Sequence, residues 1–114
     1  MTPADAKDQF RRMLAELGET VLVRRYSGLG AARTSVDTPT TARVVGYQAK
    51  DLVGAIVQGD VRVITDPDPL AAILPLTVDD KLVIRGVERA IKGVDDNTRR
   101  IQGVLVGLDI QAAG

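Results

Sequence analysis

The spacing of the apolar residues changes at Gly18, and this change constrains the fold more than any other feature of the sequence. Before Gly18 the apolar residues recur with the period of an amphipathic helix. Thr2, Pro3 and Asp5 fit a helix start, with a Thr-x-x-Asp capping box and a proline in the first turn. We therefore expect a helix over residues 3–17. The stripe that it packs on the rest of the molecule is Ala6, Phe10, Met13, Leu14 and Leu17.

After Gly18 the chain consists of short runs rich in Val, Ile, Leu and Thr, separated by turn residues and without helical connections. Such a pattern favours an antiparallel sheet, and a small closed barrel is one of its common forms. We predict a mainly β protein with a single domain over residues 1–114. It comprises the helix, an antiparallel β-barrel of about six strands over residues 20–110, and one long inter-strand loop. The expected strands are 20–26, 41–47, 60–65, 80–86, 89–94 and 99–111.

The connections between these strands carry glycine, proline and small polar residues. Residues 27–40 are predicted to form a loop, and residues 86–88 to turn the chain between two hairpin strands. Three prolines between positions 66 and 75 exclude a regular central strand there. Gly103 and Gly107 predict bends or bulges in a long last strand.

The chain contains no Cys and no His. Disulfides, soft-ligand zinc sites and the usual general base near neutral pH are therefore excluded. A Gly-x-Gly at Gly28 and Gly30 lacks the third glycine and the following helix of a dinucleotide fingerprint. We therefore expect that the protein is not an enzyme and that it binds no cofactor and no metal ion. The run around Asp66 and Asp68 lacks the Gly and terminal Glu of a calcium loop, and Asp95 and Asp96 precede Asn97 in an ordinary turn. The acidic residues considered as metal ligands are Asp66, Asp68, Asp79, Asp80, Asp95 and Asp96.

The charge balance and the hydropathy of the sequence argue against several further classes of protein. Lys and Arg together number 15, as do Asp and Glu, and this balance argues against a protein whose main task is to grip a nucleic-acid backbone. No apolar run reaches the ~20 residues of a membrane span. The first ten residues lack the apolar core of a secretory signal. We expect a protein that is made in a reducing cytoplasm and does not contact a membrane.

The segment over residues 47–60 is too apolar for an ordinary surface loop. Leu52, Val53, Ile56 and Val57 repeat with helical spacing. They predict either a strand or short helix that closes the barrel, or an excursion that meets a partner. The pairs Arg24–Arg25 and Arg99–Arg100 predict solvated faces, or surfaces that face neighbouring subunits or DNA in a ring.

The order of these features resembles the head-closure, or stopper, proteins of tailed bacteriophages and related gene-transfer particles. The resemblance is carried by "VLVRRY" with its following loop, by "ARVVGYQAKDLVGAIVQGDVRVI" and by "DKLVIRGVERAIKGVDDNTRR". It covers nearly the whole chain from Thr20, and it lies in spacing rather than in a catalytic signature. The N-terminal helix is less typical of the short members of the family.

The resemblance implies a virion neck protein, assembled in the bacterial host cytoplasm. Such proteins are small β-barrels that form a ring of six or twelve subunits, close the DNA-filled head and offer the docking surface for the tail. The implied partners are other copies of the chain, the portal and adaptor proteins, the tail terminator or tail tube, and packaged DNA in the channel. The family's channel segment corresponds here to residues 48–59. The residues expected to act there are Gln48, Lys50, Asp51, Leu52, Val53, Gly54, Ile56, Val57 and Gln58.

Other functions stay open on the sequence alone. An OB-like nucleic-acid-binding barrel would need stacking aromatic residues and a basic groove. The chain has two Tyr, one Phe, no Trp and a net charge of zero. Another neck ring protein, such as an adaptor or a tail terminator, shares most of the expected features. A small hydrolase or nucleotide-binding enzyme is remote because the required side chains are missing.

Overall fold

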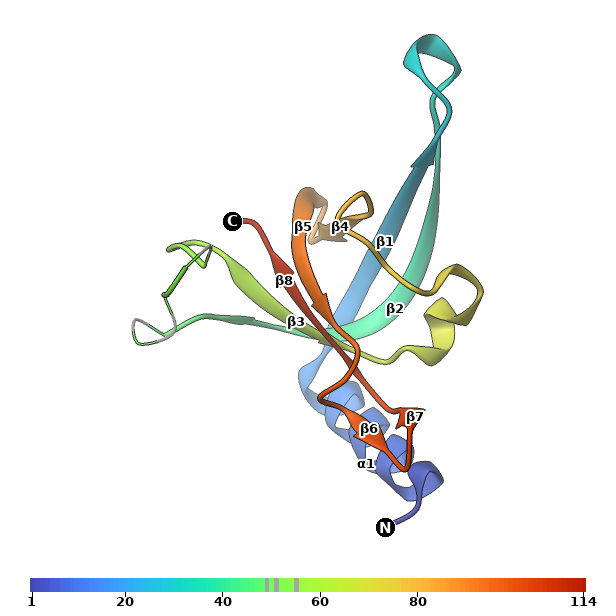
Figure 1. Cartoon of the computed structure of the whole chain (residues 1–114), viewed down its shortest axis with the longest axis vertical. Helices are drawn as coiled ribbons and strands as arrows, with labels where there is room; N and C mark the ends of the chain where they lie inside the picture. Colours follow the sequence, from blue (N-terminus) through green and yellow to red (C-terminus); the bar gives the residue numbers. More distant parts are fainter. Residues whose placement is uncertain (49, 51, 55) are drawn as a thin grey trace.

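The computed structural model describes residues 1–48, 50, 52–54 and 56–114, and contains one long helix and a closed antiparallel barrel (Figure 1). The barrel order is β1-β2-β3-β8-β5-β4, and the predicted mainly β fold with an N-terminal helix is confirmed. The elements are α1 (Pro3–Leu17), β1 (Glu19–Ser27), η1 (Gly30–Ala32), β2 (Thr34–Gly46), β3 (Val61–Thr65), η3 (Asp68–Ile73), β4 (Lys81–Ile84), β5 (Val87–Asp95), β6 (Arg100–Ile101), β7 (Val104–Leu105) and β8 (Leu108–Ala112).

The connectivity of the barrel contains a Greek key. Strands β1, β2 and β3 follow one another as antiparallel neighbours, and the long connection through η3 returns the chain so that β4 lies beside β1. β8 completes the barrel by pairing with β3 on one side and with β5 on the other. Each barrel strand therefore has a neighbour on both sides, at least over part of its length.

Alternating side chains of the strands fill the barrel with small aliphatic groups. Val21 and Val23 point inward from β1, and Leu108, Ile110 and Ala112 point inward from β8. All five are at most 1% exposed. Because the chain has few aromatic residues, Val, Leu, Ile and Ala build this core, as its composition predicts.

The helix begins with the predicted capping box. The Thr2 side chain accepts the Asp5 backbone N–H at 3.1 Å, and the Asp5 carboxylate accepts the Thr2 N–H at 3.2 Å. Ala6, Phe10 and Leu14 are buried against Ile64 and Val106 in a second apolar cluster outside the barrel. Leu17, predicted to belong to the packed stripe, is instead 55% exposed, because the helix ends beside it and the chain turns into β1.

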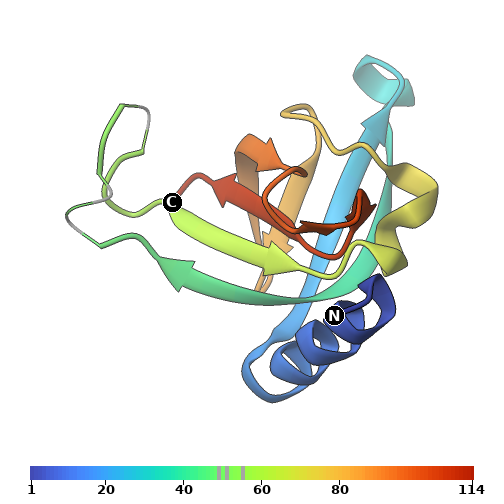
Figure 2. The same ribbon diagram turned by 60° about the horizontal axis from the view of Figure 1, so that its bottom comes forward.

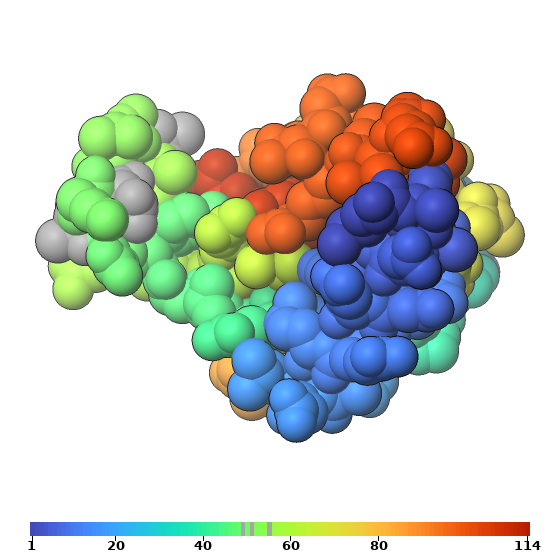
Figure 3. All heavy atoms as spheres, turned by 90° about the horizontal axis from the view of Figure 1, so that it is seen from below, coloured from blue at the N-terminus to red at the C-terminus, as the bar shows by residue number. Residues whose placement is uncertain are grey.

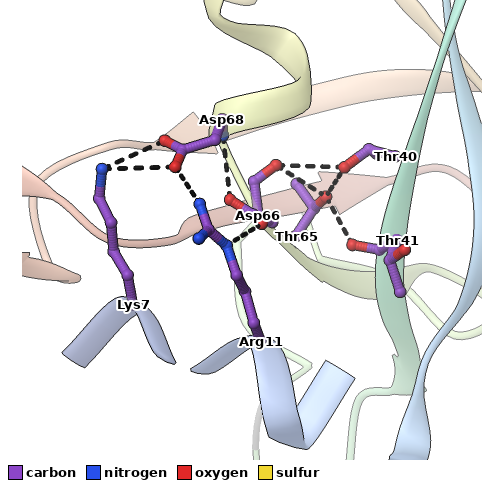
Figure 4. A network of polar contacts seen from close by, with 7 residues as sticks. All are labelled: Lys7, Arg11, Thr40, Thr41, Thr65, Asp66 and Asp68. Carbon is purple, nitrogen blue, oxygen red and sulfur yellow. Dashed lines mark hydrogen bonds and ion pairs between the residues drawn. The ribbon is translucent and has the colours of Figure 1, made fainter. Parts of the chain in front are cut away.

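A polar network ties the other side of α1 to the connection that follows β3 (Figure 4). Lys7 lies 3.3 Å from a carboxylate oxygen of Asp68, and Arg11 pairs with both Asp66 and Asp68. Behind these ion pairs, the buried hydroxyl groups of Thr40 and Thr65 lie 2.9 Å apart. The helix is thus held by an apolar cluster on one side and by ion pairs on the other.

The prediction of a loop over residues 27–40 is wrong. β2 begins at Thr34, and β1 and β2 form a hairpin whose pairing runs from Ser27 opposite Thr34 to Glu19 opposite Ala42. The first residues of β2 are exposed on both faces, so they show no alternation of polar and apolar side chains. Pro39 also argued against a strand, but at a strand edge its missing N–H costs little.

The prediction of one long strand over residues 99–111 is also wrong. β6 and β7 form a small hairpin, and only residues from Leu108 onward belong to the barrel. Gln102 and Gly103 have φ values of 52° and 78°, which suit a tight hairpin turn. The turn between β4 and β5 is likewise at Arg85 and Gly86, with φ of 49° and 79°. It was expected over residues 86–88, but Val87 and Glu88 belong to β5.

Replacing Ile110 with Ala tests the assignment of β8 to the centre of the barrel. Ile110 is fully buried, so its truncation is expected to lower the free energy of unfolding by about 2–5 kcal/mol. Val87→Ala is the matched control, because Val87 is 55% exposed and its truncation should cost less than about 0.5 kcal/mol. Chemical denaturation measures both values. An equal loss of unfolding free energy in the two variants would contradict the assignment of Ile110 to the core.

Candidate functional site

The connection between β2 and β3 projects sideways from the barrel, as Figure 2 shows. Its described residues lie outside the strands, and Leu52, Val53 and Val57 are 36%, 67% and 52% exposed. Ile56 is half-buried. Asp51, which the sequence placed in the partner segment, lies outside the described residues. The exposed apolar side chains therefore do not belong to the barrel core.

Asp60 holds the C-terminal base of this loop against the barrel. It is only 4% exposed, and its carboxylate accepts hydrogen bonds from Lys92 Nζ at 2.7 Å and from the Val57 backbone N–H at 3.1 Å. The same carboxylate accepts the Gly114 N–H at 3.2 Å and lies 3.5 Å from the side-chain amide of Gln111. One buried charge thus joins the loop to β5, β8 and the C-terminal residue.

These contacts favour the ionised form of the carboxyl group. The hydrogen bond from Lys92, followed by that from the Val57 N–H, lowers the pKa of Asp60 to about 2. Asp60 was not among the residues predicted to form the site. In the sequence it is only an acidic residue immediately before a strand rich in β-branched residues. This pattern is too common to identify a residue that anchors a loop.

The loop and the adjoining strand ends enclose an open cleft of about 570 Å³. Val45, Val53 and Ile56 supply its apolar lining, and Gln48, Lys50 and Arg62 supply its polar lining. Arg62 is ion-paired with Asp109 of β8, which fixes it beside the base of the loop. The cleft places four of the predicted partner residues together: Gln48, Lys50, Val53 and Ile56.

A second projection is the distal part of the β1–β2 hairpin, which we call the arm (residues 25–37). It rises beyond the other strands at the top of Figure 1. Leu29 at its tip is 89% exposed, and Val36 is 66% exposed. The arm was not predicted, because residues 27–37 were expected to form a loop.

Arg24 and Arg25, predicted as interface or DNA-facing residues, are both ion-paired within the chain. Arg24 donates to both carboxylate oxygens of Asp37 at 2.8 and 3.0 Å, and to Glu88 at 3.0 Å. Its pKa is raised by the bonds to Asp37 and then Glu88. Arg25 binds both oxygens of the buried Asp80, at 2.8 and 3.0 Å. Their charges are therefore locally compensated.

Arg99 and Arg100 lie beside a groove between α1 and the β6–β7 hairpin, which meet in the space-filling view of Figure 3. The groove has a volume of about 430 Å³, and Phe10, Ile101 and Val106 contribute its apolar lining. Arg99 stacks over Phe10 with its guanidinium carbon 5.8 Å from the ring centroid. Arg100 donates to the backbone carbonyls of Asp96 and Gly103 at 2.7 and 2.9 Å.

The four arginines therefore do not form one surface. Arg24 and Arg25 follow each other on β1 and face opposite sides of the strand. Arg99 and Arg100 belong to a different part of the chain, beside α1. Arg24, Arg25 and Arg99 are half-buried and Arg100 is exposed. The sequence did not predict that they are divided between separate sites.

Within the described residues, no group of three or more acidic, His or Cys side chains is arranged to hold a metal ion. No helix in this part of the chain is both long and apolar enough to cross a bilayer. The comparisons with known proteins give no match: no protein-family model fits the chain, and no curated protein and no solved structure is detectably similar to it.

Replacing Asp60 with Asn tests the anchor of the loop through its pH dependence. The folded-state pKa of Asp60 lies below that of an unfolded chain, so the charge stabilises the fold above the unfolded pKa and less as pH falls toward about 2. Wild type should be more stable than Asp60→Asn at neutral pH, and this advantage should shrink in acid. Urea denaturation across that pH range measures the difference.

Asp79→Asn is the control, because Asp79 is exposed. Its stability difference from wild type should be small at neutral pH. A difference between wild type and Asp60→Asn that stays constant down to about pH 2 would contradict the assigned role of the charge.

Proposed function

We propose that this chain is a structural component of the neck of a tailed phage or a gene-transfer particle, where it closes the DNA-filled head. The observation that carries the proposal is that a closed barrel bears two projections, the β2–β3 loop and the arm, each with exposed apolar side chains. Exposed apolar groups concentrated at the ends of projections mark contacts with other proteins. The sequence resemblance supplies the identity of the assembly.

Ring assembly accounts for two unlike projections on one subunit. Each copy in a ring contacts its two neighbours through different surfaces, because the interface is heterologous. The β2–β3 loop extends from one side of the barrel, and the arm extends along the long axis of the molecule (Figures 1 and 2). In the proposed ring, the loop reaches the central channel and its apolar residues contact the same loop of neighbouring copies.

The anchoring of the loop fits this role. Asp60 fixes the base, while Leu52 and Val53 lie beyond that anchor and are exposed. Gly54 and Gly59 have φ values of +59° and +97°, a left-handed conformation that glycine adopts without strain. Gly59 lies next to the Asp60 anchor, whereas Gly54 lies in the distal part, where it allows the backbone to change conformation when neighbouring copies assemble.

The charge distribution favours protein contacts over a strong grip on DNA. Arg24 and Arg25 are neutralised by carboxylates of the same chain, so their charges are not free for phosphates. In the proposed neck, DNA is held back mainly by the closed ring of loops. An adaptor or a tail terminator would share these features and would differ in its position along the neck.

The location of the chain in assembled particles tests this proposal directly. Tailed particles from the source of the chain should contain it, and an antibody against it should label the junction between head and tail. Cryo-microscopy of the neck should show a ring of its barrels beneath the portal and adaptor. Absence of the chain from such particles, or labelling of the capsid or distal tail alone, would overturn the proposal.

Serine replacement of Leu52, Val53, Ile56 and Val57 tests the role of the loop. Three of these residues are exposed, so the variant should fold with a free energy of unfolding within a kcal/mol or so of wild type. Particles that carry it should lose DNA or fail to join tails, measured by head DNA content and by electron microscopy. Normal particles would refute the loop's role in closure, and an unfolded variant would place these residues in the core.

The control variant carries Val78→Ser and Val87→Ser. These valines are 57% and 55% exposed, between the values for Val57 and Val53, but they lie in other segments. The control should give particles with wild-type DNA content and tails. If it fails as the loop variant does, general loss of surface apolarity explains both results and the loop has no specific role.

A further inference from the structure

One edge of β2 is unpaired along the arm. β2 pairs with β1 from Thr34 onward, but β3 pairs with β2 only from Ala42 to Gly46. The segment around Asp66 and η3 lies beside the intervening part, where the Thr40 hydroxyl donates to the Asp66 carbonyl at 3.1 Å. Figure 1 shows the distal part of the arm rising beyond η3. In the described part of the chain, residues 34–37 therefore have a strand neighbour on one side only.

The backbone groups that point to this free edge can be identified from the alternation of the strand. The Thr41 carbonyl accepts the Thr65 hydroxyl at 3.0 Å, so it points toward the β3 side of β2. Because successive backbone groups of a strand point to opposite edges, the groups of Pro39, Asp37 and Ser35 point to that side as well. Pro39 fits this assignment, since its missing N–H then costs no bond with β1.

Two opposite charges flank Ser35 on one face of the arm. The Arg33 guanidinium lies over the Tyr26 ring, 3.8 Å from its centroid, and Tyr26 is the cross-strand partner of Ser35. Asp37 pairs with Arg24 on the same face and keeps 32% of its side chain exposed. Arg33 and Asp37 are each two residues from Ser35, so the edge is self-complementary about Ser35.

We propose that this edge pairs with the same edge of a second copy, antiparallel and centred on Ser35. The two Ser35 residues then form a hydrogen-bonded pair and exchange both of their backbone bonds. Arg33 of each copy lies opposite Asp37 of the other, which creates two intermolecular ion pairs related by a two-fold axis. On the other face, Val36 of each copy meets Thr34 of the other and is shielded from water.

A second copy is the occupant because it supplies both the strand and the complementary charge pattern. A chance strand of another protein would need Asp and Arg at matching positions, four residues apart. Pairing cannot continue far toward the barrel, because Pro39 lacks an N–H and the Asp66 segment lies beside Thr40. The interface is therefore short, which predicts a weak, concentration-dependent dimer. It does not depend on a role in a phage neck.

Charge reversal in separate chains tests this register. Arg33→Asp gives an edge with two acidic residues, and Asp37→Arg gives an edge with two basic residues. Each variant alone should dimerise at least about tenfold more weakly than wild type, because like charges face each other. An equimolar mixture should form a heterodimer, because both ion pairs are then restored. Sedimentation equilibrium at low salt, from micromolar to near-millimolar protein, measures all four samples.

Two further variants separate this pairing from general charge effects. Ser35→Pro removes the central N–H from the free edge and leaves the β1 side of β2 intact, so it should abolish dimerisation while circular dichroism stays unchanged. Arg12→Asp reverses an exposed charge on α1 and should dimerise as wild type does. If Asp37→Arg fails to fold because Arg24 loses one of its two carboxylate partners, the comparison of wild type with Ser35→Pro still tests the edge.

A wild-type chain that stays monomeric at every concentration would overturn the proposal. Dimerisation that Ser35→Pro leaves unchanged would also overturn it, since the contact would then lie on another surface. A mixture of the two charge variants that associates no better than its components would refute the proposed register.

Discussion

The unequal lengths of the barrel strands determine the shape of this molecule. β4 spans Lys81–Ile84 and contacts β1 only from Leu22 to Arg24, whereas β1 and β2 continue as a hairpin well beyond that contact. Closure therefore occurs over a short section, where the aliphatic core is fully covered. The parts of β1 and β2 that exceed this section cannot be buried by the barrel and must project from it. The arm follows from this geometry.

The same constraint determines where the polar groups lie. Ion pairs such as Arg25–Asp80, Lys92–Asp60 and Arg11–Asp66 lie where a connection, a loop base or the helix meets the barrel. Each has one carboxylate that is largely buried and one cation that reaches solvent. A carboxylate in such a position is costly unless it is paired, so these pairs fix the position of segments that the core cannot hold. The opposite charges of these residues therefore pair with each other within the chain.

The agreement between sequence and structure follows from how local each signal is. The helix over residues 3–17 was predictable because its cap, its apolar period and its terminal glycine all lie within one segment. The core strands were predictable because their inward positions alternate. The arm was not, because its residues are exposed on both faces and are strands only through pairing with each other. The unusual apolar residues of the candidate loop could be recognised in the sequence, but the sequence left open whether they close the barrel or project from it. Its anchor, Asp60, depends on contacts with residues far away in the sequence.

The helix, the β-barrel class and the aliphatic core could all be predicted from the sequence. Each of these depends on the period or composition of contiguous residues, which is a local property of the chain. Three features are visible only in the folded molecule: residues 34–37 form a free strand edge, Arg24 and Arg25 are compensated by Asp37 and Asp80, and β6 and β7 lie outside the barrel. These features depend on which distant segments become neighbours. Closure of the barrel around its core determines these neighbours.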